Sequence, residues 1–446
     1  MLWRFSKKFQ FAADKVIPNS FVFCLVLTFI VYILGLIFTD AGVIDLIDYW
    51  YDGLWSMIQF AFQMTLLVVV CSAAAKSPFV EKILSKVSRI PKTPAAAYAF
   101  LIVIATVAGW INWAFGMILA PILSMYLSKN VRRCHFPLMV VVGYACMIGV
   151  QPICPSASAV ALLASPDHFM VDQIGVIPVT ETAFNPVGLS MAGILILLTL
   201  LVSVNFRVPE NEVVEYTGDI DFNDGDSKEK STGEVTVADR MNNSRIMMLI
   251  VGIASLIFIV QYFYTNGFKL NFNLVIFIFL TLNFFLYQTP LKFTDAIRDN
   301  MALAAPVMIQ FPFYGGIMGM MASSGLTEVV ANGLIAVATE KTIYWFSYLS
   351  ASIVNLFVPS QGGQWIVQGP ILVKAAEPFN AHLPTVVSAF MYGDEATNLI
   401  QPLYIIPALS LVNMKLKQAW GLMAFIWFLW FIATTIGFIV LPMIFL

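Results

Sequence analysis

Two adjacent carboxylates, Asp394 and Glu395, are the residues of this sequence that most clearly indicate chemistry. The chain has 26 acidic residues, and these two fall well inside a long apolar segment, 384–411. A charge within hydrocarbon is costly, so such residues usually carry a proton or bind an ion. A buried carboxylate favours its protonated form and could carry a coupling proton; if it stays ionised, Na⁺ held with helix-break carbonyls is the alternative. The remaining interpretation is a structural pair satisfied by Tyr392, Asn398 or water.

Polar residues that could hold an anion occur in two short segments and in this apolar segment. No Lys, Arg or His falls at the predicted midplane, so helix N-termini and amide or hydroxyl donors would bind a carboxylate. The glycines would let the backbone approach, and the two tryptophans would offer apolar walls, or serve only as packing residues. The candidate substrate-binding residues are Asn112, Trp113, Gly116, Asn355, Ser360, Gln361, Gly362, Gly363, Gln364, Trp365, Tyr392, Asn398 and Gln401.

Composition places these residues in a membrane protein. Apolar residues make up 59% of the 446 residues and charged ones 11%, whereas soluble domains carry about 25% charged residues. The first apolar run lacks a small-residue cleavage site, so we expect a retained span. Uncharged stretches of about 18 residues or more, enough to cross a bilayer, recur at 20–39, 188–206, 246–264, 271–288 and 418–446.

The distribution of charge predicts the orientation. Cytoplasmic loops are enriched in Lys and Arg, which places the N-terminus, 76–92 and 129–133 in the cytoplasm and the acidic stretches 40–53 and 167–181 outside. Of the 24 basic residues, those predicted to lie outside are Lys269, Lys341 and Lys374.

Two segments are too short to cross a bilayer twice. Only 36 residues separate Lys92 from Lys129, and two crossings with a turn need more than about 40. We therefore predict a re-entrant hairpin at about 93–128 entering from the cytoplasm, and a second at about 343–376 entering from outside. Irregular backbone is tolerated at that depth where it lines a polar cavity.

The same pattern occurs in both halves of the chain. Each half has two spans, a hairpin, a broken span and a final span; the hairpins carry Asn112 and Asn355, and the broken spans are interrupted at Gln151-Pro and Gln401-Pro. A single break could serve packing alone, but matched breaks favour a site between the hairpin tips. The predicted fold is an all-α polytopic membrane protein with two inverted repeats, about nine transmembrane helices and two re-entrant hairpins.

We divide the chain into a first repeat (1–206), a hydrophilic cytoplasmic linker (207–245), a connecting helix (246–264) and a second repeat (265–446), which the connecting helix inverts in the membrane. The linker has ten acidic and five basic residues among Gly, Ser and Asn. Such a composition predicts a solvated segment.

Other function classes find little support. No phosphate loop, zinc-ligand spacing or nucleophile elbow appears, so we predict no enzyme and no metal cofactor, and no basic tract suggests nucleic acid. A channel usually builds its pore by oligomeric symmetry, whereas matched hairpins suit alternating access. The three histidines fall in predicted loops, and the cysteines are expected to pack: Cys24, Cys71, Cys134, Cys146 and Cys154.

Several segments resemble the bacterial short-chain fatty acid transporter family. The most specific is 355–370, with the sequence NLFVPSQGGQWIVQGP; others are GWINW at 109–113 and IQFPFYG at 309–315. The likeness covers nearly the whole chain. Two departures leave the substrate open: the family tends to have three glycines where this chain has Gln361-Gly-Gly, and a Gly-rich break where this chain has 151–156.

The resemblance implies a transporter of short monocarboxylates such as butyrate or acetoacetate, in a superfamily with inverted repeats and elevator motion. We therefore predict a secondary active transporter in the bacterial inner membrane, coupled to H⁺ or Na⁺, with the proton favoured because it would neutralise a monocarboxylate. A Na⁺-coupled symporter for dicarboxylates or another small organic anion is the alternative. Partners are the substrate, the coupling ion and the bilayer, with a homodimer as a candidate assembly.

Overall fold

The computed structural model describes residues 20–206, 208–218, 220, 236–267, 270–355 and 361–446. Every regular element in these ranges is a helix, which confirms the predicted all-α class. Seven helices in the described part are long and apolar enough to cross a membrane: Ile58–Ala75, Pro94–Ile111, Phe136–Leu163, Pro186–Asn205, Val237–Asn266, Pro290–Ser324 and Leu416–Phe445. Shorter apolar helices are Cys24–Phe38, Phe272–Tyr287, Leu326–Val337 and Ile343–Val354.

The first part of the chain contains two long helices on either side of a turn, followed by a helix that is broken. Its elements are α2 (Ser20–Phe38), α3 (Val43–Ser56), α4 (Ile58–Ala75), α5 (Pro78–Val87), α6 (Pro94–Ile111), α7 (Trp113–Asn130), α8 (Phe136–Val150), η1 (Gln151–Ile153), α9 (Ser158–Leu163), α10 (Val171–Ile174), α11 (Val179–Thr182) and α12 (Pro186–Asn205).

The remaining elements belong to the linker and to the second part of the chain. The linker contains η2 (Glu210–Glu212) and α13 (Val237–Asn242). After it come α14 (Arg245–Asn266), α15 (Phe272–Tyr287), α16 (Pro290–Ser324), α17 (Leu326–Val337), α18 (Ile343–Val354), α19 (Gln361–Ala376), η3 (Glu377–Phe379), α20 (Leu383–Asn398), α21 (Pro402–Leu411) and α22 (Leu416–Phe445).

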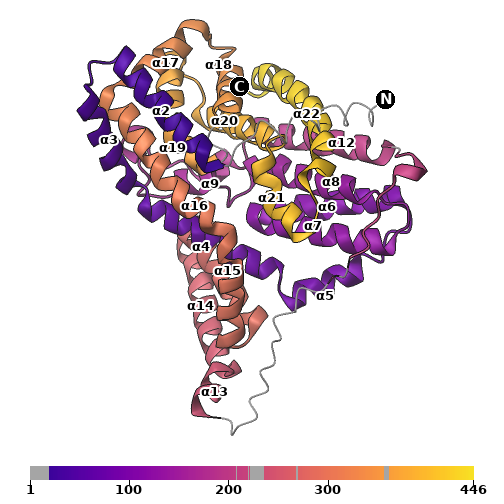
Figure 1. Ribbon diagram of the computed structural model, residues 1–446. Coiled ribbons are helices and arrows are strands. Elements are labelled where there is room, and N and C mark those ends of the chain that lie inside the picture. Colours follow the sequence, from indigo (N-terminus) through magenta and orange to yellow (C-terminus); the bar gives the residue numbers. More distant parts are fainter. Residues whose placement is uncertain (1–19, 207, 219, 221–235, 268–269, 356–360) are drawn as a thin grey trace.

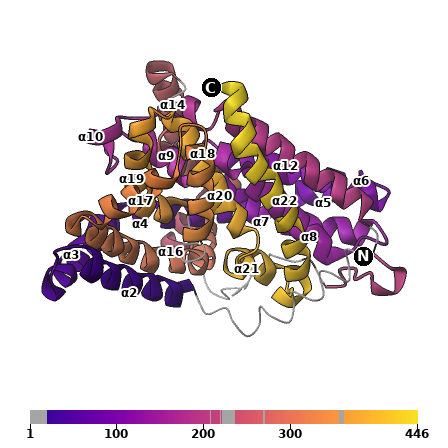
Figure 2. The ribbon, with the colours of Figure 1, turned by 90° about the horizontal axis from the view of Figure 1, so that it is seen from above.

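The helices form two groups. In one group α16 packs against α2, α3 and α4, and α15 packs against α4 and α14. In the other group, α6, α7 and α8 pack together, α12 packs against both α6 and α22, and α18 packs against α20. Figures 1 and 2 show α2, α3 and α16 on one side of the molecule and α6, α8 and α12 on the other.

Glycines hold α3 close to α16. A Cβ on Gly315 would lie 2.5 Å from the carbonyl oxygen of Gly53, and one on Gly319 would meet the carbonyl of Tyr49. Small residues let membrane helices approach this closely. The acidic stretch 40–53, which was predicted to be an external connection, is thus largely the helix α3. Its tyrosine, tryptophan and glycine residues pack against α16, and its aspartate side chains are exposed.

Both broken spans occur where the sequence predicted them. The first breaks between Val150 and Ser158, where proline removes a helical donor, and the second breaks between Asn398 and Pro402. A proline also disfavours helical geometry in the residue before it. These breaks expose backbone groups inside the apolar core of the molecule.

The predicted first hairpin is formed by α6 and α7, which meet at Asn112. Its Oδ1 accepts the Phe115 N–H at 3.0 Å and so caps α7. Each helix has 18 residues, about 27 Å, which is close to the length of a span. The expectation that this segment is too short to cross twice is therefore not supported by helix length, and entry and exit on the same side stay a prediction. A Cβ on Gly116 would lie 2.7 Å from the Gly109 Cα, which means that these two glycines allow the helices to turn tightly.

We expect Gly116→Val to destabilise the hairpin, because the added side chain must push α7 away from Gly109. Overpacking of this kind costs about 1–3 kcal/mol, and the apparent melting temperature in detergent should fall by several degrees. Gly193→Val is the matched control, since a Cβ at Gly193 meets nothing within 4 Å. Equal melting temperatures for the two variants would contradict this account of the turn.

Part of the predicted solvated linker is docked. The Phe136 N–H donates to the Val214 carbonyl at 2.7 Å, the Val214 N–H donates to Nδ1 of His135 at 3.1 Å, and the Tyr216 ring lies 4.9 Å from that of Phe136. Burial lowers the pKa of His135 to about 4, which keeps the imidazole neutral so that Nδ1 can accept this hydrogen bond. The apolar residues scattered among the acidic ones explain why residues 208–218 pack on the protein.

Candidate functional site

The two carboxylates lie near the end of α20, just before the second break, and both are buried. Nδ2 of Asn398 donates to Oδ2 of Asp394 at 2.8 Å and to Oε2 of Glu395 at 3.3 Å. None of the ion pairs within the described residues involves either carboxylate. A buried carboxylate without a cation is costly unless it takes up a proton or binds an ion.

Asn355, at the C-terminal end of α18, is held against this part of α20. Nδ2 of Asn355 lies 2.6 Å from the Asp394 carbonyl oxygen, 2.9 Å from Oγ1 of Thr397 and 2.8 Å from Oδ1 of Asn398. In return, Nε2 of Gln401 donates to the Asn355 carbonyl at 2.8 Å. The second hairpin is therefore fixed directly to the second broken span.

Gln361, the first residue of α19, connects the two halves. Its Nε2 donates to Oε1 of Glu395 at 3.3 Å, and its Oε1 accepts the Ala159 N–H of α9 at 3.1 Å. A Cβ on the next residue, Gly362, would lie 3.0 Å from the Cβ of Ser158. The start of α19 thus lies against the first break, and one side chain joins that break to a carboxylate of the second half.

The first hairpin also contacts the first break. Nδ2 of Asn112 donates to Oγ of Ser156 at 2.9 Å, and that hydroxyl donates to the Ile111 carbonyl at 3.1 Å. Ser156 belongs to the first break, two residues before α9. We call the two hydrogen-bonded groups, which meet through the chain between Ser156 and Ala159, the central network; its side chains are Asn112, Ser156, Asn355, Gln361, Asp394, Glu395, Asn398 and Gln401.

Aromatic residues border the central network. The Trp113 ring stacks on Tyr404 with centroids 6.4 Å apart, and the Tyr404 hydroxyl lies 3.3 Å from Nε2 of Gln151. The Tyr144 hydroxyl donates to the Asn398 carbonyl at 2.8 Å. Tyr144, Tyr404 and Gln151 were not among the candidate substrate-binding residues predicted from the sequence. The signal for Gln151 was its position, because it precedes the proline of the first break as Gln401 precedes that of the second.

Other predicted substrate-binding residues make packing contacts outside the central network. The Tyr392 hydroxyl donates to the Gly188 carbonyl of α12 at 2.8 Å, and Trp365 packs edge-on against Phe390, with centroids 4.9 Å apart. Gly116 packs against Gly109 in the first hairpin. Gly363 is buried in the first turn of α19. Ser360 lies outside the described residues.

Three buried oxygens in this region have no hydrogen-bond partner among the described residues: Oδ1 of Asn355, Oε1 of Gln364 and Oδ1 of Asp394. Leaving a buried acceptor unpaired costs about 1–3 kcal/mol. Such atoms are therefore available to a ligand, a proton or a cation. The described residues contain no cluster of three or more His, Cys, Asp or Glu suited to a metal ion.

The chain is similar in sequence to known proteins. The family model described as "Short chain fatty acid transporter" matches residues 1–443. A relative from Haemophilus influenzae is 30% identical over 440 residues, covering 94% of this chain and 96% of its own. A relative from Escherichia coli K12 is 28% identical over 428 residues, with the same coverage. Both are described as candidate short-chain fatty acid transporters.

One solved structure has a similar fold. The YdaH transporter of Alcanivorax borkumensis aligns with a TM-score of 0.59 at 13% identity and covers 95% of this chain and 96% of its own. That transporter is described as having an unusual topology. At this identity the likeness concerns the fold.

Proposed function

We propose, from the premise that this chain belongs to the short-chain fatty acid transporter family, that it is a secondary active transporter of short-chain monocarboxylates in the bacterial inner membrane. Members of the family are transporters rather than enzymes. The finer points of the proposal are the substrate, the coupling ion and the movement.

The observation that carries the proposal is the central network itself. The turn at Asn112 contacts the first break at Ser156, and the end of α18 at Asn355 contacts the second broken span at Asn398. Gln361 joins the residue after the first break, Ala159, to Glu395 of the buried carboxylate pair. Paired interrupted helices of this kind place substrate and coupling-ion sites near the membrane midplane. The two groups of helices support an elevator: the group with hairpins and breaks would move against the group built on α16.

The charge of the network bears on the substrate. Its hydrogen-bonding side chains are amides, a hydroxyl and two carboxylates, without Lys, Arg or His. A monocarboxylate accompanied by one proton or one Na⁺ would balance charge there more readily than a dianion. This favours the monocarboxylate over the alternative, a Na⁺-coupled symporter for dicarboxylates or another small organic anion.

Reconstitution in proteoliposomes tests the proposal. Uptake of labelled butyrate, acetoacetate and a dicarboxylate would be measured under an imposed proton gradient and, separately, an imposed Na⁺ gradient. We expect monocarboxylates to accumulate with one of the two gradients. Accumulation of the dicarboxylate alone would establish the alternative, and no accumulation of any carboxylate would refute both.

We expect Gly363→Leu to abolish substrate binding while the protein still folds, because a bulky side chain at the start of α19 would block approach of the substrate to the backbone. Butyrate binding by calorimetry and thermal stability would be measured in detergent, with Gly193→Leu as the control. Unchanged affinity in Gly363→Leu would place the site elsewhere.

A further inference from the structure

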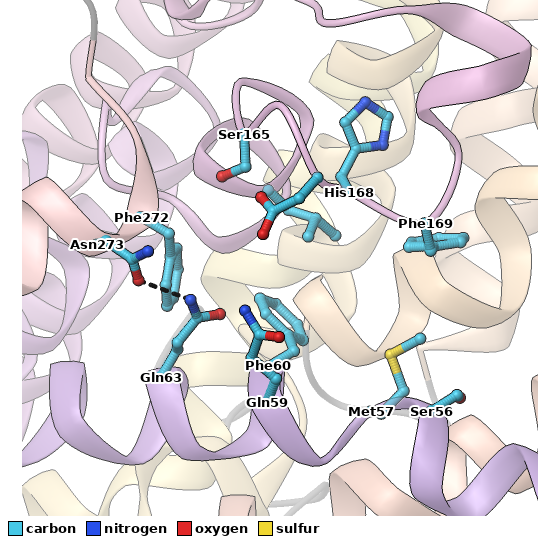
Figure 3. A pocket seen from close by; sticks show the side chains of 12 residues that line it. Ser56, Met57, Gln59, Phe60, Gln63, Ser165, His168, Phe169, Phe272 and Asn273 are labelled. Carbon is cyan, nitrogen blue, oxygen red and sulfur yellow. Dashed lines mark hydrogen bonds between the residues drawn. The ribbon is translucent and has the colours of Figure 1, made fainter.

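A pocket of about 130 Å³ opens on the face that the charge distribution places outside. It lies between the start of α4, the start of α15 and the loop after α9 (Figure 3). We call it the outer pocket; its polar lining residues are Gln59, Gln63, Ser165, Asp167, His168 and Asn273, with Ser56 at its edge.

The lining of the outer pocket contains no Lys or Arg. Asp167 carries the one formal charge among its lining residues. Nδ1 of His168 accepts the Met170 N–H at 3.2 Å, and Nε2 lies 2.9 Å from the Gly175 carbonyl, to which it must donate. Both imidazole nitrogens are therefore engaged with the loop that carries His168. A ligand here meets amides, hydroxyls and one carboxylate.

The amides suit a single carboxyl group. Nε2 of Gln63 donates to Oδ1 of Asn273 at 2.6 Å, which joins α4 to α15 and orients both side chains toward the pocket (Figure 3). This bond leaves Nδ2 of Asn273 to donate to a ligand, with Gln59 one turn away on α4. Asp167 would repel any carboxylate anion, and a dianion more strongly than a monoanion. The outer pocket thus disfavours a dicarboxylate more than a monocarboxylate, whose single carboxyl group the amide donors can hold.

An aromatic side chain contacts both the outer pocket and the start of α19. A Cβ on Gly362 would lie 3.0 Å from Cζ of Phe60, and Phe60 also lines the outer pocket. The ring is buried and packs 5.5 Å from Phe272 and 5.4 Å from Phe311, measured between centroids. Gln361, which donates to Glu395, directly precedes Gly362.

We propose that the outer pocket is a capture site for external short-chain monocarboxylic acids, that Asp167 discriminates there against dicarboxylates, and that Phe60 closes the path from it to the central network. The proposal rests on the proposed transport function and adds to it a second substrate-binding site on the external side. Since Phe60 contacts both the outer pocket and the start of α19, its size would limit the alkyl chain that passes.

The first test measures charge discrimination. Asp167→Asn and the matched control Asp172→Asn, an exposed acid of the same external loop that does not line the pocket, would be compared in proteoliposomes. External succinate should inhibit butyrate uptake about three- to tenfold more strongly in Asp167→Asn than in the parent, as expected for loss of one nearby like charge. Inhibition should be unchanged in Asp172→Asn. Equal inhibition in the parent and both variants would overturn the role of Asp167.

The second test measures the path. Phe60→Ala, with Phe60→Leu in case the larger truncation fails to fold, should raise hexanoate uptake relative to butyrate about tenfold, whereas Phe62→Ala, on the exposed face of α4, should not. An unchanged hexanoate-to-butyrate ratio in a folded Phe60 variant would overturn the inference. A parent protein that takes up no monocarboxylate would instead refute the proposed function, so the two failures are distinguishable.

Discussion

Asp394→Asn and Glu395→Gln are each expected to abolish accumulation of butyrate against its gradient while leaving downhill exchange measurable. Both carboxylates are buried in α20, share Nδ2 of Asn398 as a donor, and have no cationic partner among the described residues. A group in this position is suited to taking up a proton or a Na⁺ on one side and releasing it on the other. The neutral variants keep the shape of the side chains and remove the exchangeable charge.

The size of the effect depends on the gradient. One pH unit is equivalent to about 1.36 kcal/mol, so coupling to one proton supports about tenfold accumulation. An uncoupled variant should equilibrate to equal concentrations inside and outside. Substrate uptake, current and pH change would be measured together, and the same experiment with a Na⁺ gradient identifies the ion.

Glu181→Gln is the control, because Glu181 is an exposed acid of α11. It should accumulate butyrate as the parent does. If both Asp394→Asn and Glu395→Gln also accumulate butyrate as well as the parent, the carboxylate pair is structural and another group carries the coupling.

Local signals in the sequence predicted the membrane fold, the turn at Asn112 and both helix breaks. Hydropathy, Gly and Pro act on the residues next to them, so their consequences can be inferred without knowing the tertiary structure. The helix α3 was not predicted, because its three aspartates conceal the small and aromatic residues that pack against α16. Docking of 208–218 was missed for a similar reason, since its few apolar residues are dispersed among acidic ones.

The contacts between distant residues could not be predicted in the same way. Nothing in the sequence indicates that Gln361 bonds the backbone of Ala159, 202 residues away, or that Tyr392 faces α12 rather than the carboxylates. Such pairs depend on how the two halves pack. The type of residue at the candidate site was predictable from the cost of burying charge, whereas the partner of each residue was not.

The link between the halves leads to the second large expected effect: Gln361→Leu should lower the rate of butyrate transport by about ten- to a hundredfold. The change leaves the Ala159 N–H and Oε1 of Glu395 without their partner, and each unpaired buried group costs about 1–3 kcal/mol. The Ala159 N–H lies just after the first break and Glu395 belongs to the carboxylate pair, so the substitution would disturb both places.

Gln368→Leu separates this effect from a general loss of hydrogen bonds. Gln368 lies two turns further along the same helix, is equally buried, and also makes two side-chain bonds, to Ser350 at 2.9 Å and from Gln364 at 2.8 Å. Those bonds stay within the second hairpin. The two variants should therefore lose similar thermal stability, while only Gln361→Leu loses most of its transport. Similar transport rates in both variants would show that the contact between the halves at Gln361 has no special part in transport.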